Sequence, residues 1–219
     1  MKKKLLLAAA TLSLLNSCGD KGTEGAATTK DTATTVVTAE KKEEARPIPD
    51  SATMARNWEQ YMTPGEVHKM IASWDGDWTA DAVMWHSPDA PPDTAKLIVN
   101  HKMILGGRYQ VAAHKGNMMG MPFEGISTTG YDNAKKKFIN TWVDNMGTGM
   151  MYMEGTWDEG SKAITYIGKM VSIERNDGSE EGVKQVLRIT DPTHQQMEMF
   201  MIDPSGKETK TMEIWYTKK

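Results

Sequence analysis

Two histidines lie in one predicted strand hairpin, at a spacing that could bring them together inside a sheet protein. The run 94–105 alternates in hydropathy, and its more apolar face carries His101. If the glycine pair 106–107 forms a two-residue turn, Arg108 and His114 join that face, with His114 diagonal to His101. These side chains could orient an anionic head group, or ligate a metal or haem. A turn one residue longer sends Arg108 and His114 to the other face, and the plainer alternative is ordinary core or solvent-facing histidines.

Other residues suited to catalysis lack any local signature that selects them. His68, His86 and His194 have no partner at metal-ligand spacing, and the strand glutamates are single residues, so no glycosidase pair of carboxylates is indicated. The chain contains no HExxH, GxSxG, P-loop or GxGxxG motif. We therefore predict no catalytic residue, no metal site and no cofactor, and expect a protein that is not an enzyme.

Methionine is unusually frequent, since the chain holds 18 Met beside 3 Phe. If residues 158–161 form a hairpin loop, Met153 lies opposite Tyr166. Most of the apolar residues of the two strands that flank this loop then share one face. With Ile202 opposite Lys207, the last hairpin places its methionines on one face and its Glu and Thr residues, Thr209 included, on the other. The resulting candidate ligand-binding residues are Met151, Met153, Trp157, Tyr166, Met170, Met197, Met199, Met201 and Met212, with His101, Arg108 and His114.

Three interpretations of the methionines stay open. Methionine fills irregular gaps in a core whatever the function of the protein. It also gives an adaptable, polarizable lining to a cavity for apolar ligands. Finally, thioethers suit Cu(I), and Met118, Met119 and Met121 are close together in one predicted loop.

The predicted fold is all-β, an antiparallel barrel of about ten strands preceded by one or two short helices. Short runs divided by turn residues predict strands near 77–85, 94–105, 107–114, 122–131, 137–144, 149–157, 162–171, 183–191, 195–202 and 208–216. That many antiparallel strands leave open edges unless the sheet closes, so we expect a barrel, with a two-sheet sandwich as the alternative.

The segment before the strands is predicted to be helical over 51–74. In the run from Thr63 to Glu66, Thr63 is expected to be the N-cap of a second helix, Pro64 its first residue and Glu66 its third. The Asp-Gly-Asp run at 75–77 is expected to end that helix.

The N-terminus predicts a bacterial lipoprotein. Lys2 to Lys4 form a basic region and Leu5 to Leu15 an apolar one, too short for a membrane-spanning helix. The tetrad from Leu15 to Cys18 is similar to a lipobox, which implies cleavage before Cys18 and lipidation of its thiol. We therefore expect a signal peptide at 1–17, the lipidated Cys18 and a disordered linker over 18–50, and a barrel domain over 51–219. The alternative is an ordinary signal peptide with an incidental cysteine.

Composition narrows the partners and the location. A chain of 219 residues, 39% of them hydrophobic, accommodates one ordinary domain, and its net charge of -3 argues against a nucleic-acid partner. The single cysteine excludes an internal disulfide. The expected partners are a membrane, through the lipid anchor, and a small hydrophobic ligand. The expected location is the bacterial cell envelope, on the periplasmic or outer-membrane side.

Three runs of residues together resemble a known bacterial family. They are the segment from Gly120 to Gly125, the segment from Gly130 to Phe138, and Trp142 to Gly149 with its Trp-Val-Asp-Asn-Met-Gly-Thr-Gly sequence. The resemblance is to domain of unknown function 1579, over about residues 64–216. It implies a calycin-like barrel, similar to lipocalins, and no established activity.

The sequence thus predicts a lipid-anchored barrel that binds a small apolar or amphipathic ligand between Met-lined walls. A structural or interaction module with a solid core is one alternative, and a copper or haem protein is the other.

Overall fold

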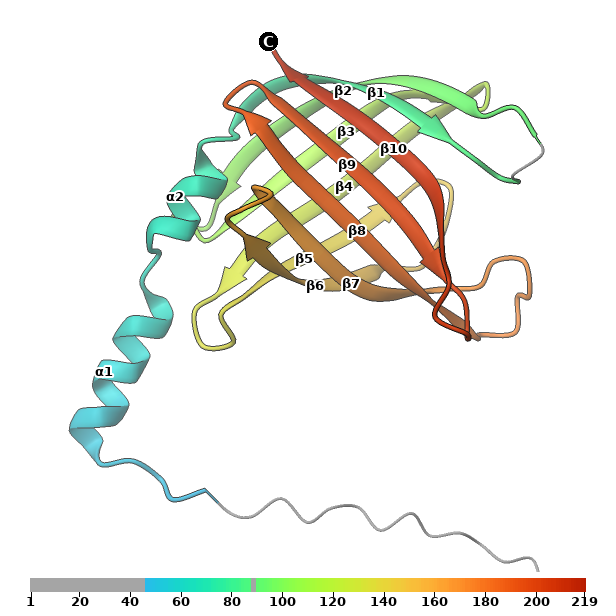
Figure 1. Ribbon diagram of the computed structural model, residues 1–219. Helices are drawn as coiled ribbons and strands as arrows, with labels where there is room; N and C mark the ends of the chain where they lie inside the picture. The colour runs from blue at the N-terminus through green and yellow to red at the C-terminus, as the bar shows by residue number, and fades with distance from the viewer. Residues whose placement is uncertain (1–45, 88–89) are drawn as a thin grey trace, which may run out of the picture. The chain divides into compact units, whose positions relative to one another are not determined.

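Ten antiparallel strands close into a barrel in the computed structural model, which describes residues 46–87 and 90–219 (Figure 1). The strands are β1 Gly76–Met84, β2 Asp93–Ile104, β3 Tyr109–Met118, β4 Met121–Asp132, β5 Lys137–Asp144, β6 Met151–Asp158, β7 Ala163–Val171, β8 Glu180–Asp191, β9 His194–Ile202 and β10 Glu208–Lys218. Each strand pairs with its neighbours in sequence, and β10 pairs with β1 from Met84 opposite Met212 to Trp78 opposite Lys218. The predicted all-β barrel is therefore confirmed, and the sandwich alternative is excluded.

The barrel belongs to one compact unit, Ile48–Lys219. The predicted signal peptide at 1–17, Cys18 and most of the predicted linker lie outside the described residues. The described part of the chain contains no helix that is long and apolar enough to cross a membrane.

Two helices, α1 Ser51–Met62 and α2 Glu66–Ala72, precede the barrel. The predicted start of α2 was wrong, because its N-cap is Gly65 and not Thr63. Thr63 instead ends α1, where its N–H and its hydroxyl both donate to the Glu59 carbonyl. A residue before proline also avoids helical torsions, and Thr63 is extended before Pro64.

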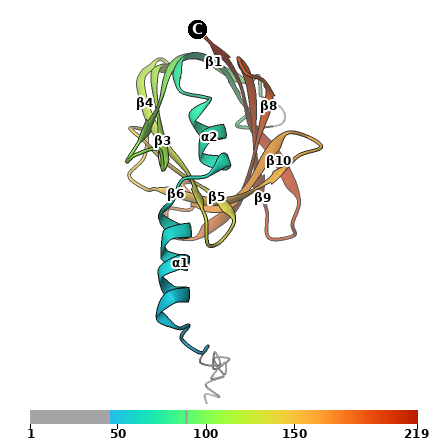
Figure 2. The ribbon, with the colours of Figure 1, turned by 90° about the vertical axis from the view of Figure 1, so that its left-hand side faces the viewer.

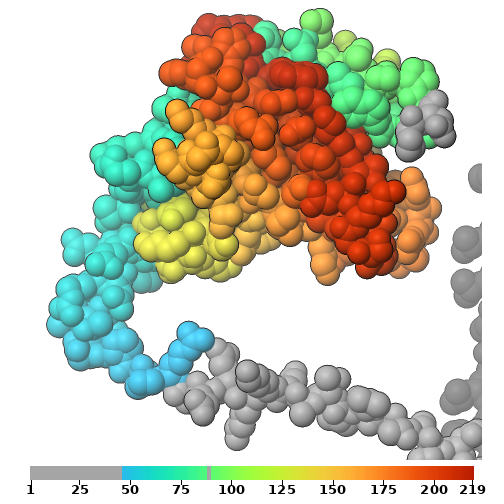
Figure 3. Space-filling view, in the orientation of Figure 1, coloured from blue at the N-terminus to red at the C-terminus, as the bar shows by residue number. Residues whose placement is uncertain are grey.

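The helix α2 covers one end of the barrel, whereas α1 extends away from it (Figure 2). The fully buried Ile71 comes from α2. No residue of α1 is buried, and in the space-filling view the N-terminal part of α1 stands clear of the barrel (Figure 3). Its C-terminal carbonyls are held by two barrel turns: Arg108 Nη2 donates to Met62 O at 2.7 Å, and Asn133 Nδ2 donates to Thr63 O at 2.8 Å.

The alternation of strand residues sorts the side chains as predicted. In the β6–β7 hairpin the pairing is two residues away from the predicted one, so Met153 faces Gly168 and not Tyr166. A shift of two preserves the face, and Met153 and Tyr166 are both buried in the interior. In the last hairpin the pairing of β9 with β10 shifts by one residue between Lys210 and Met212. Beyond this irregularity Met199 faces Met212 inside the barrel. Nearer that turn Thr209 faces Met201, and its predicted place on the opposite face was wrong.

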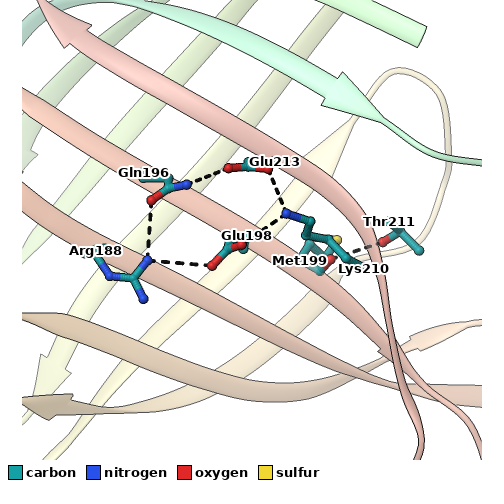
Figure 4. A network of polar contacts seen from close by, with 7 residues as sticks. All are labelled: Arg188, Gln196, Glu198, Met199, Lys210, Thr211 and Glu213. Carbon is teal, nitrogen blue, oxygen red and sulfur yellow. Dashed lines mark hydrogen bonds and ion pairs between the residues drawn. The ribbon is translucent and has the colours of Figure 1, made fainter. Parts of the chain in front are cut away.

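The outer face of β8, β9 and β10 carries a network of charged side chains (Figure 4). Lys210 Nζ lies 3.2 Å from Glu198 Oε1 and 2.8 Å from Glu213 Oε2. Gln196 Nε2 donates to Glu213 Oε1, and Arg188 approaches Glu198 at 3.6 Å. These polar groups therefore connect three neighbouring strands on the outside, while the methionines of the same strands point inside.

We expect Gly168→Ala to lower the free energy of unfolding by about 1–3 kcal/mol, the range for overpacking a tight site. A Cβ at residue 168 would lie 2.4 Å from the Tyr152 carbonyl oxygen and 2.6 Å from Met153 Cγ. The backbone oxygen cannot move without disturbing the β6–β7 ladder. Denaturant unfolding measures the change, with Gly147→Ala as control, since no atom lies within 4 Å of a Cβ there. Equal stability of the two variants would contradict this packing.

Candidate functional site

The barrel encloses a cavity of about 240 Å³. Trp74, which follows α2, lines it at the covered end. At the other end it is lined by Met118, the last residue of β3, and by Met119 and Met146, from the turns that join β3 to β4 and β5 to β6. The remaining wall is Leu97, His101, Gln110, Ala112, His114, Phe123, Ser127, Thr129, Asn140, Trp142, Asp144, Tyr166, Gln185, Leu187, Gln195, Met197, Met199, Met212, Ile214 and Tyr216.

A hydrogen-bonded chain at the covered end fixes the orientation of His101. Asp75 accepts from the Met103 N–H at 2.9 Å and from Gln110 Nε2 at 2.7 Å. Gln110 Nε2 also donates to Ile71 O, so its amide nitrogen is fully used. The Gln110 oxygen lies 3.1 Å from His101 Nδ1 and can only accept. In neutral His101 the proton must therefore be on Nδ1, which leaves Nε2 as an acceptor.

His114 lies deeper in the wall and is also neutral. Its Nδ1 lies 3.2 Å from the Ala112 carbonyl, which can only accept, so Nδ1 carries the proton. The indole of Trp142 stands edge-on to the imidazole, with ring centroids 5.1 Å apart. Burial, with a smaller contribution from His101 nearby, lowers the pKa of His114 to about 4. Burial is also the main reason that the pKa of His101 is lowered.

Three residues that line the cavity each carry a buried polar atom with no hydrogen-bond partner among the described residues. These atoms are the Tyr166 hydroxyl, Gln195 Nε2 and His101 Nε2. Tyr166 is 1% exposed and Gln195 is 3% exposed. Buried polar groups are nearly always paired, so these three atoms call for a partner from outside the described residues, such as an internal water or a guest molecule.

The structure brings together half of the residues that the sequence singled out. Those that line the cavity are His101, His114, Tyr166, Met197, Met199 and Met212. Met153 is fully buried in the core, and Trp157 lies on the inner face beside α2 with its Nε1 donating to Glu159. Partly buried against the same core are Met151, Met170 and Met201.

The predicted place of Arg108 was wrong. The β2–β3 pairing has the predicted register, with His101 opposite Ala112 and Val99 opposite His114. The ladder nevertheless ends at Ile104 and Tyr109, so Arg108 belongs to a four-residue turn. There its guanidinium is exposed and donates to the end of α1. It therefore contributes no positive charge to the cavity.

Several cavity residues were missed although the same period of two points to them. Gln195 shares the face of Met197, Gln110 that of Ala112, and Tyr216 that of Ile214. Polar type alone would argue for the outside, which is why the glutamines were not selected.

A metal site built from histidine, cysteine or acidic side chains has no support among the residues that the structure describes. Among them no group of three or more His, Cys, Asp or Glu side chains could hold a metal ion. Of the methionines proposed for copper, Met118 and Met119 both line the cavity, whereas Met121 is 47% exposed and does not.

A closed antiparallel meander around a lined cavity defines a calycin-like β-barrel protein. The family model described as "Protein of unknown function (DUF1579)" matches residues 63–218, and the chain belongs to this family. No curated protein matches the chain significantly. Among solved structures, the crystal structure of Rv2717c from M. tuberculosis is similar, with a TM-score of 0.52 and 12% identity over 72% of this chain and 99% of that one. At that identity the likeness concerns the fold alone.

We expect the stability of the barrel to fall as the pH drops from 6.5 towards 4, partly because of His114. The unfolded chain takes up a proton on this residue near pH 6.5, and the native state only near pH 4. The native state therefore loses on the order of 3 kcal/mol across this window. Urea unfolding at pH 7 and pH 4.5 should show a smaller difference for His114→Phe than for the wild type. The exposed His86→Gln is the control, and an equal effect of both variants would contradict a buried neutral His114.

Proposed function

We propose that this protein binds a small apolar or amphipathic molecule inside its barrel. The observation that carries the proposal is the cavity of about 240 Å³, whose wall combines methionines and aromatic rings with a few polar groups. Ligand sites in proteins are concave and mostly apolar, with few polar groups that orient the guest. A solid barrel would have no such space, which favours binding over the purely structural alternative.

The volume limits the size of the ligand. An apolar cavity of about 150 Å³ accommodates benzene, which corresponds to about 25 Å³ for each non-hydrogen atom. At that density, 240 Å³ holds a guest of about ten non-hydrogen atoms. A long-chain fatty acid is too large to fit entirely, so a compact guest is the better match.

Native mass spectrometry of the protein from its own host tests the proposal. A mass excess matching a small organic molecule, lost on denaturation, supports it. A bare chain that also shows no gain in melting temperature across a panel of small apolar compounds would support the structural alternative. A Soret band on addition of haem, or retention of Cu(I) against a competing chelator, would instead support the remaining alternatives.

We expect Ala112→Phe to weaken binding of an apolar probe such as ethylbenzene at least tenfold. Ala112 is 4% exposed on the cavity wall, and the larger side chain fills about 150 Å³ of the space. The neighbouring Ala113→Phe is the matched control, because residue 113 points to the outside of the same strand. Calorimetric titration gives both affinities. Undiminished binding by Ala112→Phe would place the site elsewhere.

We also propose that the barrel is tethered to a bacterial membrane through a diacylated Cys18. Support comes from the sequence: the basic and apolar runs, the lipobox-like tetrad, and a single cysteine at the required place. Two acyl chains suffice for stable attachment without a polybasic patch, which suits a chain with net charge -3.

We expect Cys18→Ser to abolish incorporation of labelled palmitate in a bacterial host and to leave an uncleaved precursor. The thiol is the only acceptor that this chain offers. Ser17→Ala keeps a small residue before the cysteine and should be labelled normally. Labelling of the Cys18→Ser chain would refute the anchor.

A further inference from the structure

The unpaired polar atoms of the cavity have a definite hydrogen-bonding pattern. Gln195 Nε2 can only donate, and the Tyr166 hydroxyl can donate or accept. Burial raises the pKa of Tyr166, so this hydroxyl keeps its proton. His101 Nε2 accepts, because the proton of the ring is on Nδ1, facing Gln110. A guest must therefore offer both a donor and an acceptor, which a hydroxyl group does with one oxygen atom.

The charges around the cavity disfavour an ionised guest. None of the described residues that line it is Lys or Arg, and burial lowers the pKa of both histidines, so neither supplies a positive charge near neutral pH. A carboxylate would lie unpaired in an apolar space and would face the lone pair of His101.

The cavity also disfavours a cationic guest. Asp144 is the one acid among the described lining residues. Its carboxylate already accepts from Trp142 Nε1 at 2.6 Å and from the N–H groups of Met146 and Gly147. Those contacts occupy the carboxylate with neighbours in β5 and in the turn after it, so an ammonium group would be desolvated without a dedicated partner.

We propose that the ligand of this barrel is an uncharged alcohol of about ten non-hydrogen atoms, whose hydroxyl makes its hydrogen bonds among Tyr166, Gln195 and His101. This inference rests on the proposed function, since it specifies the chemistry of a guest in the same cavity. The orphaned atoms select the hydroxyl, and the methionines accept the hydrocarbon part in more than one shape.

Four probes of nearly equal size separate the chemical classes: ethylbenzene, 2-phenylethanol, phenylacetate and 2-phenylethylammonium. Calorimetric titration of each into the purified full chain at pH 7.5 gives the four affinities. We expect 2-phenylethanol to bind at least tenfold more tightly than ethylbenzene, phenylacetate or the ammonium compound.

Variants identify the atoms responsible. Tyr166→Phe removes one hydroxyl and keeps the ring, and Gln195→Met removes the amide at similar volume. Each should weaken 2-phenylethanol about tenfold and leave ethylbenzene binding within a factor of two. Tyr152→Phe is the matched control, because that tyrosine is on the outer face and its hydroxyl donates to Glu154. The melting temperature of each variant shows that the barrel is intact.

The outcomes distinguish this inference from the proposed function. If ethylbenzene binds and 2-phenylethanol binds no better, internal water already satisfies the polar atoms and the alcohol assignment fails while the apolar site stands. Tighter binding of phenylacetate would likewise overturn the alcohol assignment alone. If none of the four probes binds, the proposed function itself fails.

Discussion

The pairing of β1 with β10 is the constraint on which the rest of this structure depends. It joins the first strand of the barrel to the last and removes both sheet edges, so that alternate side chains of every strand become either interior or exterior. A barrel of eight strands is just wide enough for side chains to fill it. With ten, the interior takes Trp78, Met153 and Tyr166 at full burial and still leaves a cavity. Closure therefore creates both the core and the space within it.

The covered end of the barrel converts this space into a site with defined chemistry. Asp75, at the exit from α2, holds the backbone of β2 and the amide of Gln110, and Gln110 in turn sets the tautomer of His101. Trp78 Nε1 donates to the carbonyl of Trp74, which binds the same helix exit to β1. Ile71 of α2 and Asp75, which follows the helix, thus hold the Gln110 amide that determines which nitrogen of His101 is protonated.

Much of the fold, and part of the site, could be predicted from the sequence. The face on which a strand residue lies depends only on whether it is an even or an odd number of positions from its neighbours on that face. A pairing error of two residues in the β6–β7 hairpin left Met153 and Tyr166 on the inner face. The prediction for Arg108 was wrong for a different reason. Side chains alternate between the two faces only where the strands are paired, and the β2–β3 pairing ends at Ile104. Which inner residues border the cavity depends on how side chains from opposite walls meet. It therefore depends on the volumes of side chains that come from distant parts of the sequence, which a local sequence pattern does not reveal.

The methionines acquire separate roles from their places along the barrel. Met153 packs at zero exposure within the core, where an unbranched side chain fits an irregular gap. Met197, Met199 and Met212 line the cavity, while Met119 lies at its uncovered end and is 47% exposed. Flexible thioethers tolerate guests of different shape, whereas the buried hydroxyl, amide and imidazole are fixed by their strands and tolerate little. If the barrel binds a ligand as we propose, its selectivity therefore comes from the polar groups and not from the shape of the wall.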